Sequence, residues 1–342
     1  MTRKPWRDQV VEAAIEPDLP IIDAHHHVWE HEAFPPFDPY NEDDLFADKA
    51  GSGHLILGTV FVDSHTSYRA EGPDHLRVVG ETEYAERVAQ AGMARGGSLT
   101  GTCCAIAPRA DLLLGAGAGE VLDAHAHASS RFRGIRHMTA HDADVPASAA
   151  TGAGVMKQPA FREGFVELDK RGLSFDAWLL QPQLPEIIDL ARQFPGTTII
   201  LDHLGGPMGI GRFAERRDEA FASWRDDMAT LATCPNVRVK LGGLNMGLAG
   251  VDALARDIPF TSAEMAATQK DFILTAIDLF GPARCMFESN VPVDTHGAGY
   301  GVIWNAFKRL TSDFTPEERH RLFYATAVET YRIDARQLQQ IA

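Results

Sequence analysis

Three consecutive histidines close the first apolar segment of the chain, Pro20–Val28. Asp23, His25 and His27 are spaced two residues apart, so in a β-strand they would share one face. The other face would carry Ile22, Ala24 and Val28, with the middle histidine, His26, as a structural residue. We therefore expect Asp23, His25 and His27 to point into a pocket, where two imidazoles can hold one divalent metal ion or one substrate oxygen. A hydrogen-bonded structural pair is the alternative.

Polar residues also stand at the ends of other strand-like segments. His203 follows the apolar run Ile199–Leu201 and Asp202, and it precedes a Gly-Gly-Pro turn. With an unperturbed pKa of about 6.5, a histidine at such a position could act as a general base. Arg136, in the segment FRGIRHM, could hold a substrate carboxylate through two parallel hydrogen bonds, or it could belong to an internal ion pair.

Two later segments alternate apolar and charged residues. In NVRVKLG the valines should face covering helices, which places Arg238 and Lys240 on the inner face. In RCMFESN, Glu288 and Asn290 share one face. A buried ammonium and a buried carboxylate stabilise each other. We therefore expect Lys240 and Glu288 to pair one layer below Asn290.

These segments must be positioned by a fold in which their ends meet. Short apolar segments alternate with helix-like segments along the chain, which is the pattern of βα units and a parallel sheet. The expected strands are Pro20–Val28, Leu55–Asp63, Thr100–Ala107, Phe132–Met138, Ser174–Leu180, Thr197–His203, Asn236–Gly242 and Arg284–Asn290. Eight such units predict an α/β fold, a (β/α)8 TIM barrel, with active groups at the carboxyl ends of the strands.

Helix-like periodicity and chain length complete this prediction. Apolar residues recur at helical spacing after the fifth, sixth and seventh expected strands, for example in LPEIIDLA. A TIM barrel typically needs roughly 250 residues, so the 342-residue chain has room for additional segments. We place these in an N-terminal extension, residues 1–19, and in long loops after strands one and six, residues 30–54 and 205–219. Residues 20–342 are assigned to one barrel domain.

Composition narrows the class of protein. The chain carries 32 Lys and Arg against 47 Asp and Glu, a net charge of −15, which argues against a nucleic-acid or anionic-membrane partner. Four cysteines without a CxxC motif favour reduced thiols. No apolar stretch of about 18 residues occurs that would suggest a membrane-spanning helix. We expect a cytoplasmic protein that acts on a small-molecule substrate, and the sequence leaves a homo-oligomer open.

The motifs DxHxH, GIRH, LDHLGGP, VKLGGL and MFESNVPVD, followed by a C-terminal YRI segment, occur in an order that resembles the amidohydrolase superfamily. More narrowly, the chain is similar to the amidohydrolase-2 group of lactonases, which includes 2-pyrone-4,6-dicarboxylate and sugar-acid lactonases. The resemblance extends from about Ile21 to about Ile333. It implies a TIM-barrel hydrolase that opens a lactone, usually one that bears a carboxylate.

The resemblance also implies roles for individual residues. It matches His25, His27 and His203 to the histidines of the family's site, and Arg136 to an arginine that binds the substrate carboxylate. Asn290 stands where the family usually has a strand-eight aspartate, which serves as metal ligand or general base. A neutral amide cannot accept a proton from water, so the base must be sought elsewhere.

Other residues could compensate for this departure. Asp294 lies four residues further along and could bring a carboxylate from the loop, while Gln181 stands near the position of a strand-five histidine ligand in many members of the superfamily. We expect Gln181 and Lys240 to contact the substrate. Strand four has no lysine to bridge two metals, which argues against a binuclear centre. One weakly held Zn²⁺ or Mn²⁺ on His25 and His27, or no metal, are both left open.

The expected reaction is hydrolysis of a cyclic ester at the mouth of the barrel. Water would attack the carbonyl, and His203 would accept its proton. The two strand-one histidines and Asn290 would face the developing oxyanion. Two alternatives stand beside this one: a metal-dependent decarboxylase or hydratase of the same family, and a ligand-binding barrel that has lost catalysis.

Overall fold

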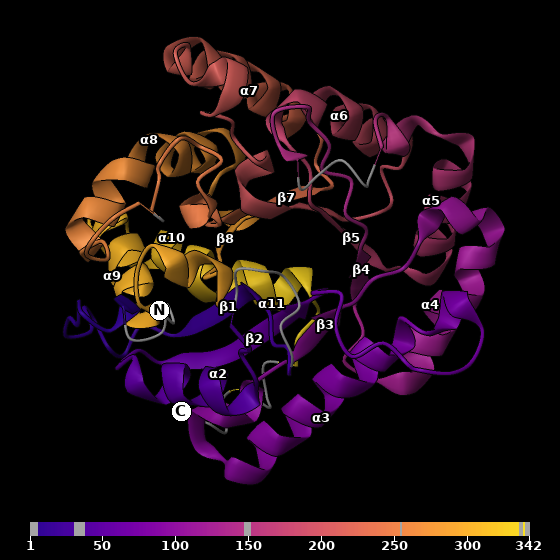
Figure 1. Cartoon of the computed structure of the whole chain (residues 1–342), viewed down its shortest axis with the longest axis horizontal. Coiled ribbons are helices and arrows are strands. Elements are labelled where there is room, and N and C mark those ends of the chain that lie inside the picture. The colour runs from indigo at the N-terminus through magenta and orange to yellow at the C-terminus, as the bar shows by residue number, and fades with distance from the viewer. Residues whose placement is uncertain (1–5, 31–37, 147–151, 254, 335–337, 339–342) are drawn as a thin grey trace.

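Eight parallel strands alternate with helices around a central axis in the computed structural model (Figure 1). The structure describes residues 6–30, 38–146, 152–253, 255–334 and 338. The strands are β1 Ile21–His26, β2 Ile56–Val62, β3 Ala105–Ala107, β4 Gly134–Arg136, β5 Ser174–Ala177, β6 Ile199–Leu201, β7 Val237–Leu241 and β8 Cys285–Phe287. They form two hydrogen-bonded groups, one ordered β1-β2-β3 and one ordered β4-β5-β6-β7-β8.

Short backbone contacts join the two groups of strands into a closed barrel. An isolated parallel bridge connects Ile106 of β3 to Phe132, just before β4. At the other seam, the backbone N–H of His27 donates to the carbonyl of Val291, just after β8, at 2.8 Å. The TIM barrel expected from the sequence is therefore confirmed, although most strands are shorter than their apolar segments suggested.

Helices cover the outside of the barrel, except that the last helix lies over the centre of the ring of strands in this view (Figure 1). They are α2 Glu42–Gly51, α3 Val79–Arg95, α4 Ala118–Ala128, α5 Pro159–Arg171, α6 Leu184–Gln193, α7 Arg217–Ala232, α8 Ser262–Phe280, α9 Tyr300–Leu310, α10 Pro316–His320 and α11 Thr326–Thr330. In α6, a proline in the first turn fits the helix start, and the apolar stripe includes the buried residues Ile187 and Ile188. In the described part of the chain, no helix has both the length and the apolar character needed to cross a membrane.

Alternation along the strands separates an outer and an inner layer of side chains. Val239 and Phe287 belong to the large apolar layer between the strands and the helices, whereas Ile200 and Met286 belong to a smaller cluster inside the barrel. Tyr331, which follows α11, joins the inner cluster from the C-terminal segment. The inside of the barrel is therefore apolar in its lower part, and it becomes polar toward the carboxyl ends of the strands.

The expected orientation of β1 is wrong at Asp23. The pairing of β1 with β2 shifts register between Asp23 and His26, which marks a β-bulge. Asp23 therefore turns away from His25 and His27, and its carboxylate accepts hydrogen bonds from Ser289 Oγ at 2.6 Å and from the Tyr300 hydroxyl of α9 at 2.9 Å. Ile22 and Ala24, expected on the outer face, belong to the inner cluster.

The proposed N-terminal extension lies against α9 where the structure describes it. The Ile15 backbone N–H donates to Asn305 Oδ1 at 2.8 Å, and Lys308 Nζ donates to the Glu16 carbonyl at 2.8 Å. Treating residues 1–19 as a unit separate from the barrel domain stays a prediction, and residues 1–5 lie outside the described residues.

Long segments follow β1 and β6 as expected, but the first is not a loop throughout, because the helix α2 occupies Glu42–Gly51, with Asn41 as its N-cap. In the first loop, residues 31–37 lie outside the described residues, and the remainder contains Tyr40, which is bridged to Trp29, followed by α2. The second loop contains a single short turn, Gly211–Phe213, before α7 begins.

Candidate active site

Charged and imidazole side chains from five strands meet near the carboxyl end of the barrel. The fully buried members of this cluster are His25, Asp176, Asp202, Lys240 and Glu288. They come from β1, β5, β7 and the residues directly after β6 and β8 (Figure 1). Buried charges are costly unless they are paired or bind a ligand, so each contact within this cluster matters for both stability and chemistry.

His203 is held by Glu288 through two hydrogen bonds. Glu288 Oε1 accepts from His203 Nδ1 at 2.8 Å and from the His203 backbone N–H at 3.1 Å. Burial opposes ionisation of Glu288, but the neighbouring His203 and His25 lower its pKa to about 2. The hydrogen bond to the carboxylate assigns the proton to Nδ1 and leaves a lone pair on Nε2. This is the geometry of an imidazole base that is oriented by a carboxylate.

The local backbone explains how His203 reaches this position. β6 ends at Leu201, and a short turn, Asp202–Gly205, follows instead of the two further strand residues that the sequence suggested. His203 has a left-handed backbone, with φ at 52°. Its ring lies 4.6 Å from that of His25 and 4.8 Å from that of Trp178, measured between centroids. A strained non-glycine residue in a buried polar cluster is a feature of functional sites.

His25 and His27 face each other through their Nε2 atoms, which are 3.1 Å apart. His27 Nδ1 lies 2.8 Å from the Val62 carbonyl and must donate to it, so His27 Nε2 has a lone pair. Lys240 Nζ lies 3.1 Å from His25 Nδ1 and can donate to it, in which case His25 donates from Nε2 to His27. Burial lowers the pKa of both imidazoles well below the usual range.

The other tautomer of His25 would prepare the pair for a cation. His25 Nδ1 is also 3.0 Å from Glu288 Oε2, and a proton shared there would leave lone pairs on both facing Nε2 atoms. Ligand atoms of His25, Asp202 and His203 all lie within 4.8 Å of one another. Asp202 Oδ2 is buried and has no hydrogen-bond partner among the described residues. Histidine nitrogens and a carboxylate oxygen are ligands that zinc accepts, so this donor set fits a divalent metal ion.

The expected ion pair between Lys240 and Glu288 is wrong. Lys240 Nζ contacts Asp176 Oδ1 at 2.6 Å and Asp202 Oδ1 at 2.9 Å, while Glu288 binds the two histidines. β7 lies between β6 and β8, and the two carboxylates come from β5 and the end of β6. Burial opposes the charge of Lys240, but Asp176 and Asp202 raise its pKa, so it stays an ammonium.

Asp176 and Asp202 were not among the residues predicted for the site. Alternation alone could have indicated Asp176, because it shares a strand face with Ser174 in SFDAWLL. Asp202 directly precedes His203 and ends an apolar run, which is the same signal that singled out His203. Which of several inward carboxylates would meet Lys240 depends on the stagger between strands, and the sequence does not contain that information.

Asn290 and Asp294 form a buried pair beside the histidines. Asn290 Nδ2 donates to Asp294 Oδ1 at 2.9 Å, and the Asn290 backbone N–H donates to the His25 carbonyl at 3.0 Å. Burial raises the pKa of Asp294 to about 7, although hydrogen bonds from Asn290 and Asn245 oppose the shift. The pair explains why an amide is suitable at position 290, because a second carboxylate there would face Asp294 directly.

Asn290→Asp is accordingly expected to lower the free energy of unfolding by about 1–3 kcal/mol. The loss should be larger at about pH 8 than at about pH 5, because a proton on one of the two carboxyl groups removes the repulsion. Denaturant unfolding at both pH values measures it. The double variant Asn290→Asp/Asp294→Asn exchanges amide and carboxylate and should recover most of the loss. An equal loss in the double variant would contradict the pairing.

Two predicted substrate-binding residues already have protein partners. Arg136 Nη2 donates to the Asp63 carbonyl, and its Nε lies 3.5 Å from Asp63 Oδ2, which corresponds to the internal ion pair that the sequence left open. Gln181 donates to the Ala220 carbonyl at 2.8 Å and accepts from the Met208 backbone N–H at 2.9 Å. Gln181 thus holds the loop after β6, and the substrate roles of both residues stay predictions.

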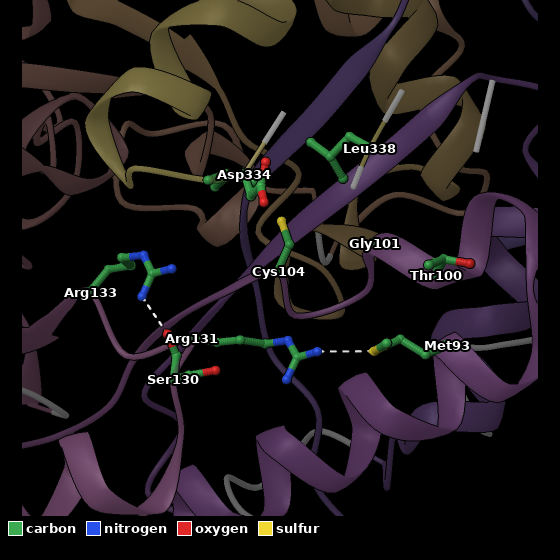
Figure 2. A pocket seen from close by; sticks show the side chains of 10 residues that line it. Met93, Thr100, Gly101, Cys104, Ser130, Arg131, Arg133, Asp334 and Leu338 are labelled. Carbon is green, nitrogen blue, oxygen red and sulfur yellow. Dashed lines mark hydrogen bonds between the residues drawn. The ribbon is translucent and has the colours of Figure 1, made fainter. Parts of the chain in front are cut away.

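A separate cavity of about 410 Å³ lies at the opposite end of the barrel (Figure 2). Its lining includes Cys104, directly before β3, and Arg131 and Arg133, which precede β4. The strands are parallel, so the amino ends of β3 and β4 lie away from the histidines, which gather at the carboxyl ends. None of the predicted site residues lines this cavity.

Comparisons with known proteins agree with the geometry. A family model described as amidohydrolase matches residues 22–333. An uncharacterized protein of Sinorhizobium fredii is 33% identical over 92% of this chain and 99% of its own length. The L-fucono-1,5-lactonase of Burkholderia multivorans is 29% identical, but the match covers 60% of this chain and 64% of that enzyme.

A crystal structure of a Burkholderia multivorans amidohydrolase with bound zinc has a TM-score of 0.70 and 25% identity, and the match covers 92% of this chain and 99% of that one. The match to the family model over most of the chain shows that this protein belongs to the amidohydrolase family.

Proposed function

We propose that this amidohydrolase is a lactonase, which hydrolyses a cyclic ester with His203 as the general base. The observation that carries the proposal is the buried hydrogen bond between His203 Nδ1 and Glu288, at 2.8 Å. The bond orients the imidazole and leaves Nε2 available for a proton. The partial similarity to L-fucono-1,5-lactonase supports a lactone as the substrate class.

In the proposed reaction, His203 Nε2 takes a proton as the water oxygen bonds to the ester carbonyl. Glu288 is ionised, so it stabilises the imidazolium that forms. The bond between the carbonyl carbon and the ring oxygen then breaks, and His203 returns the proton to the departing alkoxide. The product is an open-chain hydroxy acid, and no co-reactant besides water is needed.

The negative charge that develops on the carbonyl oxygen needs a donor nearby. We propose that His25 supplies it, because its Nε2 carries a proton when Lys240 donates to its Nδ1, and its ring lies close to that of His203. His27 Nε2 has a lone pair and acts as the acceptor for this proton before the substrate binds. One donor of this kind contributes about 3 kcal/mol to transition-state stabilisation. Asn290 lies beside this pair, but its Nδ2 donates to Asp294, and its Oδ1, which has no hydrogen-bond partner among the described residues, is an acceptor, which cannot stabilise an oxyanion.

A divalent cation such as zinc or manganese could be held by His25, Asp202 and His203. When bound, it would polarise the ester carbonyl. His203 cannot use one nitrogen both to hold a cation and to accept a proton, so the two roles exclude each other. Lys240 already provides a positive charge at 2.9 Å from Asp202. We propose that the cation is weakly held and is not needed for hydrolysis.

Removal of metal ions should therefore leave lactone hydrolysis unchanged. The measurement compares protein dialysed against a chelator with the same protein after zinc or manganese has been added back, with the metal content determined for both. Added zinc could lower the rate by occupying His203. Activity that disappears with chelation and returns with metal would contradict His203 as the base and would favour the metal-dependent alternative.

A panel of lactones tests the proposed function directly. It should contain five- and six-membered sugar-acid lactones and lactones that carry a ring carboxylate, with acid release followed by a pH indicator. We expect the wild-type protein to open at least one of them faster than the same solution without protein. A folded protein that hydrolyses none of them would favour the ligand-binding barrel.

A further inference from the structure

A second polar cluster adjoins the histidines at the ends of β2, β3 and β4. Its first member, Asp63, directly follows Val62, the residue whose carbonyl accepts from His27 Nδ1. His65 Nδ1 lies 3.6 Å from Asp63 Oδ2, and Arg109 Nη1 lies 2.8 Å from His65 Nε2. Arg136 contacts Asp63 from the other side. This chain of contacts extends from His27 to Arg109, which follows β3.

The two arginines of this cluster differ in their partners. Arg136 is buried and pairs with the Asp63 carboxylate. Arg109 is only partly buried, and its guanidinium contacts an imidazole nitrogen of His65. Among the described residues, no carboxylate lies within ion-pair distance of Arg109, although the chain is strongly acidic overall. A guanidinium without a counter-ion at the mouth of a barrel is suited to bind an anionic ligand.

The loop that presents His65 is fixed by two buried acidic side chains, Glu81 and Asp63. Glu81 Oε1 accepts from the backbone N–H groups of Ser64 at 2.8 Å and Thr66 at 3.1 Å. Asp63 Oδ1 accepts from the backbone N–H of His65 at 3.1 Å. His65 has a left-handed backbone, with φ at 57°. These hydrogen bonds hold a strained loop in one conformation before a ligand arrives, which is the property that a binding site needs.

Tyr68 belongs to the same loop and stands three residues after His65. Its hydroxyl oxygen is buried and has no hydrogen-bond partner among the described residues. Burial is the main cause that raises its pKa, the carboxylates of Asp63 and Glu81 add to the increase, and Arg109 and Arg136 oppose it. The hydroxyl therefore keeps its proton and can donate it. A buried donor without an acceptor is costly, unless a ligand supplies the acceptor.

We propose that Arg109 and Tyr68 bind the carboxylate of the substrate, whereas Arg136 serves as the counter-ion of Asp63. This inference rests on the proposed function, and it narrows the substrate class to lactones that carry a carboxylate. The carboxylate of the substrate would lie beside Arg109, on the side of Asp63 that faces away from His27. The ester group of the same substrate would extend back toward the histidines. Arg109 would provide charge and direction, and Tyr68 would provide one further hydrogen bond.

The test uses a planar dicarboxylate that cannot be hydrolysed. Isothermal titration compares isophthalate with the uncharged isophthalamide, which has the same shape. The variants are Arg109→Met, Arg109→Lys and Tyr68→Phe. Arg225→Met is the control, since it removes one positive charge from an exposed position on α7.

The wild-type protein should bind isophthalate more tightly than isophthalamide. Arg109→Met should weaken isophthalate binding about 10- to 100-fold and Tyr68→Phe about 3- to 10-fold, with isophthalamide unaffected. Arg109→Lys should recover part of the loss, and Arg225→Met should change nothing. Equal affinities of the wild type for both compounds, or an Arg109→Met variant that matches Arg225→Met, would overturn the inference.

Separate measurements of binding and of turnover distinguish a failure of this inference from a failure of the proposed function. The titration needs no hydrolysis, so an Arg109-dependent preference in a protein that opens no lactone would refute the lactonase proposal alone. Where a carboxylated lactone is hydrolysed, Arg109→Met should raise its KM and leave the KM of its methyl ester unchanged. Equal KM changes for the acid and the ester would refute the role of Arg109 alone.

Discussion

Replacing His203 with asparagine is expected to lower kcat for lactone hydrolysis by at least about 100-fold. Asparagine can still donate to Glu288 from its side-chain amide, but it has no basic nitrogen in the place of Nε2. The KM should change little, because we propose that Arg109 and Tyr68, and not His203, bind the substrate carboxylate. Initial rates over a range of substrate concentrations measure both constants. Full activity in His203→Asn would rule out His203 as the base.

Glu288→Gln tests the same hydrogen bond from its other end. The amide has almost the same shape but no charge, so it cannot stabilise the imidazolium that forms at His203. We expect kcat to fall by about 10- to 100-fold, which is less than for the loss of the base itself. An effect of Glu288→Gln on thermal stability without an effect on kcat would mean that the carboxylate is structural only.

Lys240→Met is expected to lower the free energy of unfolding by about 3–5 kcal/mol. The side chain is fully buried, and its ammonium contacts the carboxylates of Asp176 and Asp202. Removing it would leave both carboxylates without their cation in a low-dielectric environment, whereas methionine fills a similar volume. Denaturant-induced unfolding followed by circular dichroism gives the difference directly.

A second buried lysine provides the matched control. Lys49 of α2 donates to the Ser98 carbonyl at 3.0 Å and to Thr102 Oγ1 at 2.9 Å, both of which are uncharged. Lys49→Met removes a buried ammonium but leaves no carboxylate without a partner, so the loss should be clearly smaller. If Lys240→Met costs no more than Lys49→Met, the cluster does not depend on the charge of Lys240.

The alternation of strand residues predicted much of this architecture. It predicted a barrel, and it placed Lys240, Glu288 and the end of β6 on the inside, because a soluble core has no packing reason to bury charges. It failed at Asp23, where a β-bulge reverses the face of the residues before it. A bulge adds one residue to a strand without leaving a sequence pattern that alternation can reveal.

Pairwise contacts were harder to predict than positions. The alternation placed Lys240 on the inner face but gave it the wrong partner, because the stagger of neighbouring strands decides which carboxylate it meets. Arg136 contacts Asp63, which lies 73 residues away in the chain. Arg109 lies in a segment without any recognisable motif, so only the fold shows that it contacts His65 beside Asp63.

The most direct test of the lactonase proposal is mass spectrometry of the products formed in heavy-oxygen water. A lactone from the panel is incubated with the wild type and with His203→Asn, and the molecular masses of the products are measured. Hydrolysis through the proposed water attack predicts the gain of one water, with the heavy oxygen in the new carboxylate, and this product should be nearly absent with His203→Asn. Loss of carbon dioxide without incorporation of the label, or equal incorporation by both proteins, would contradict it.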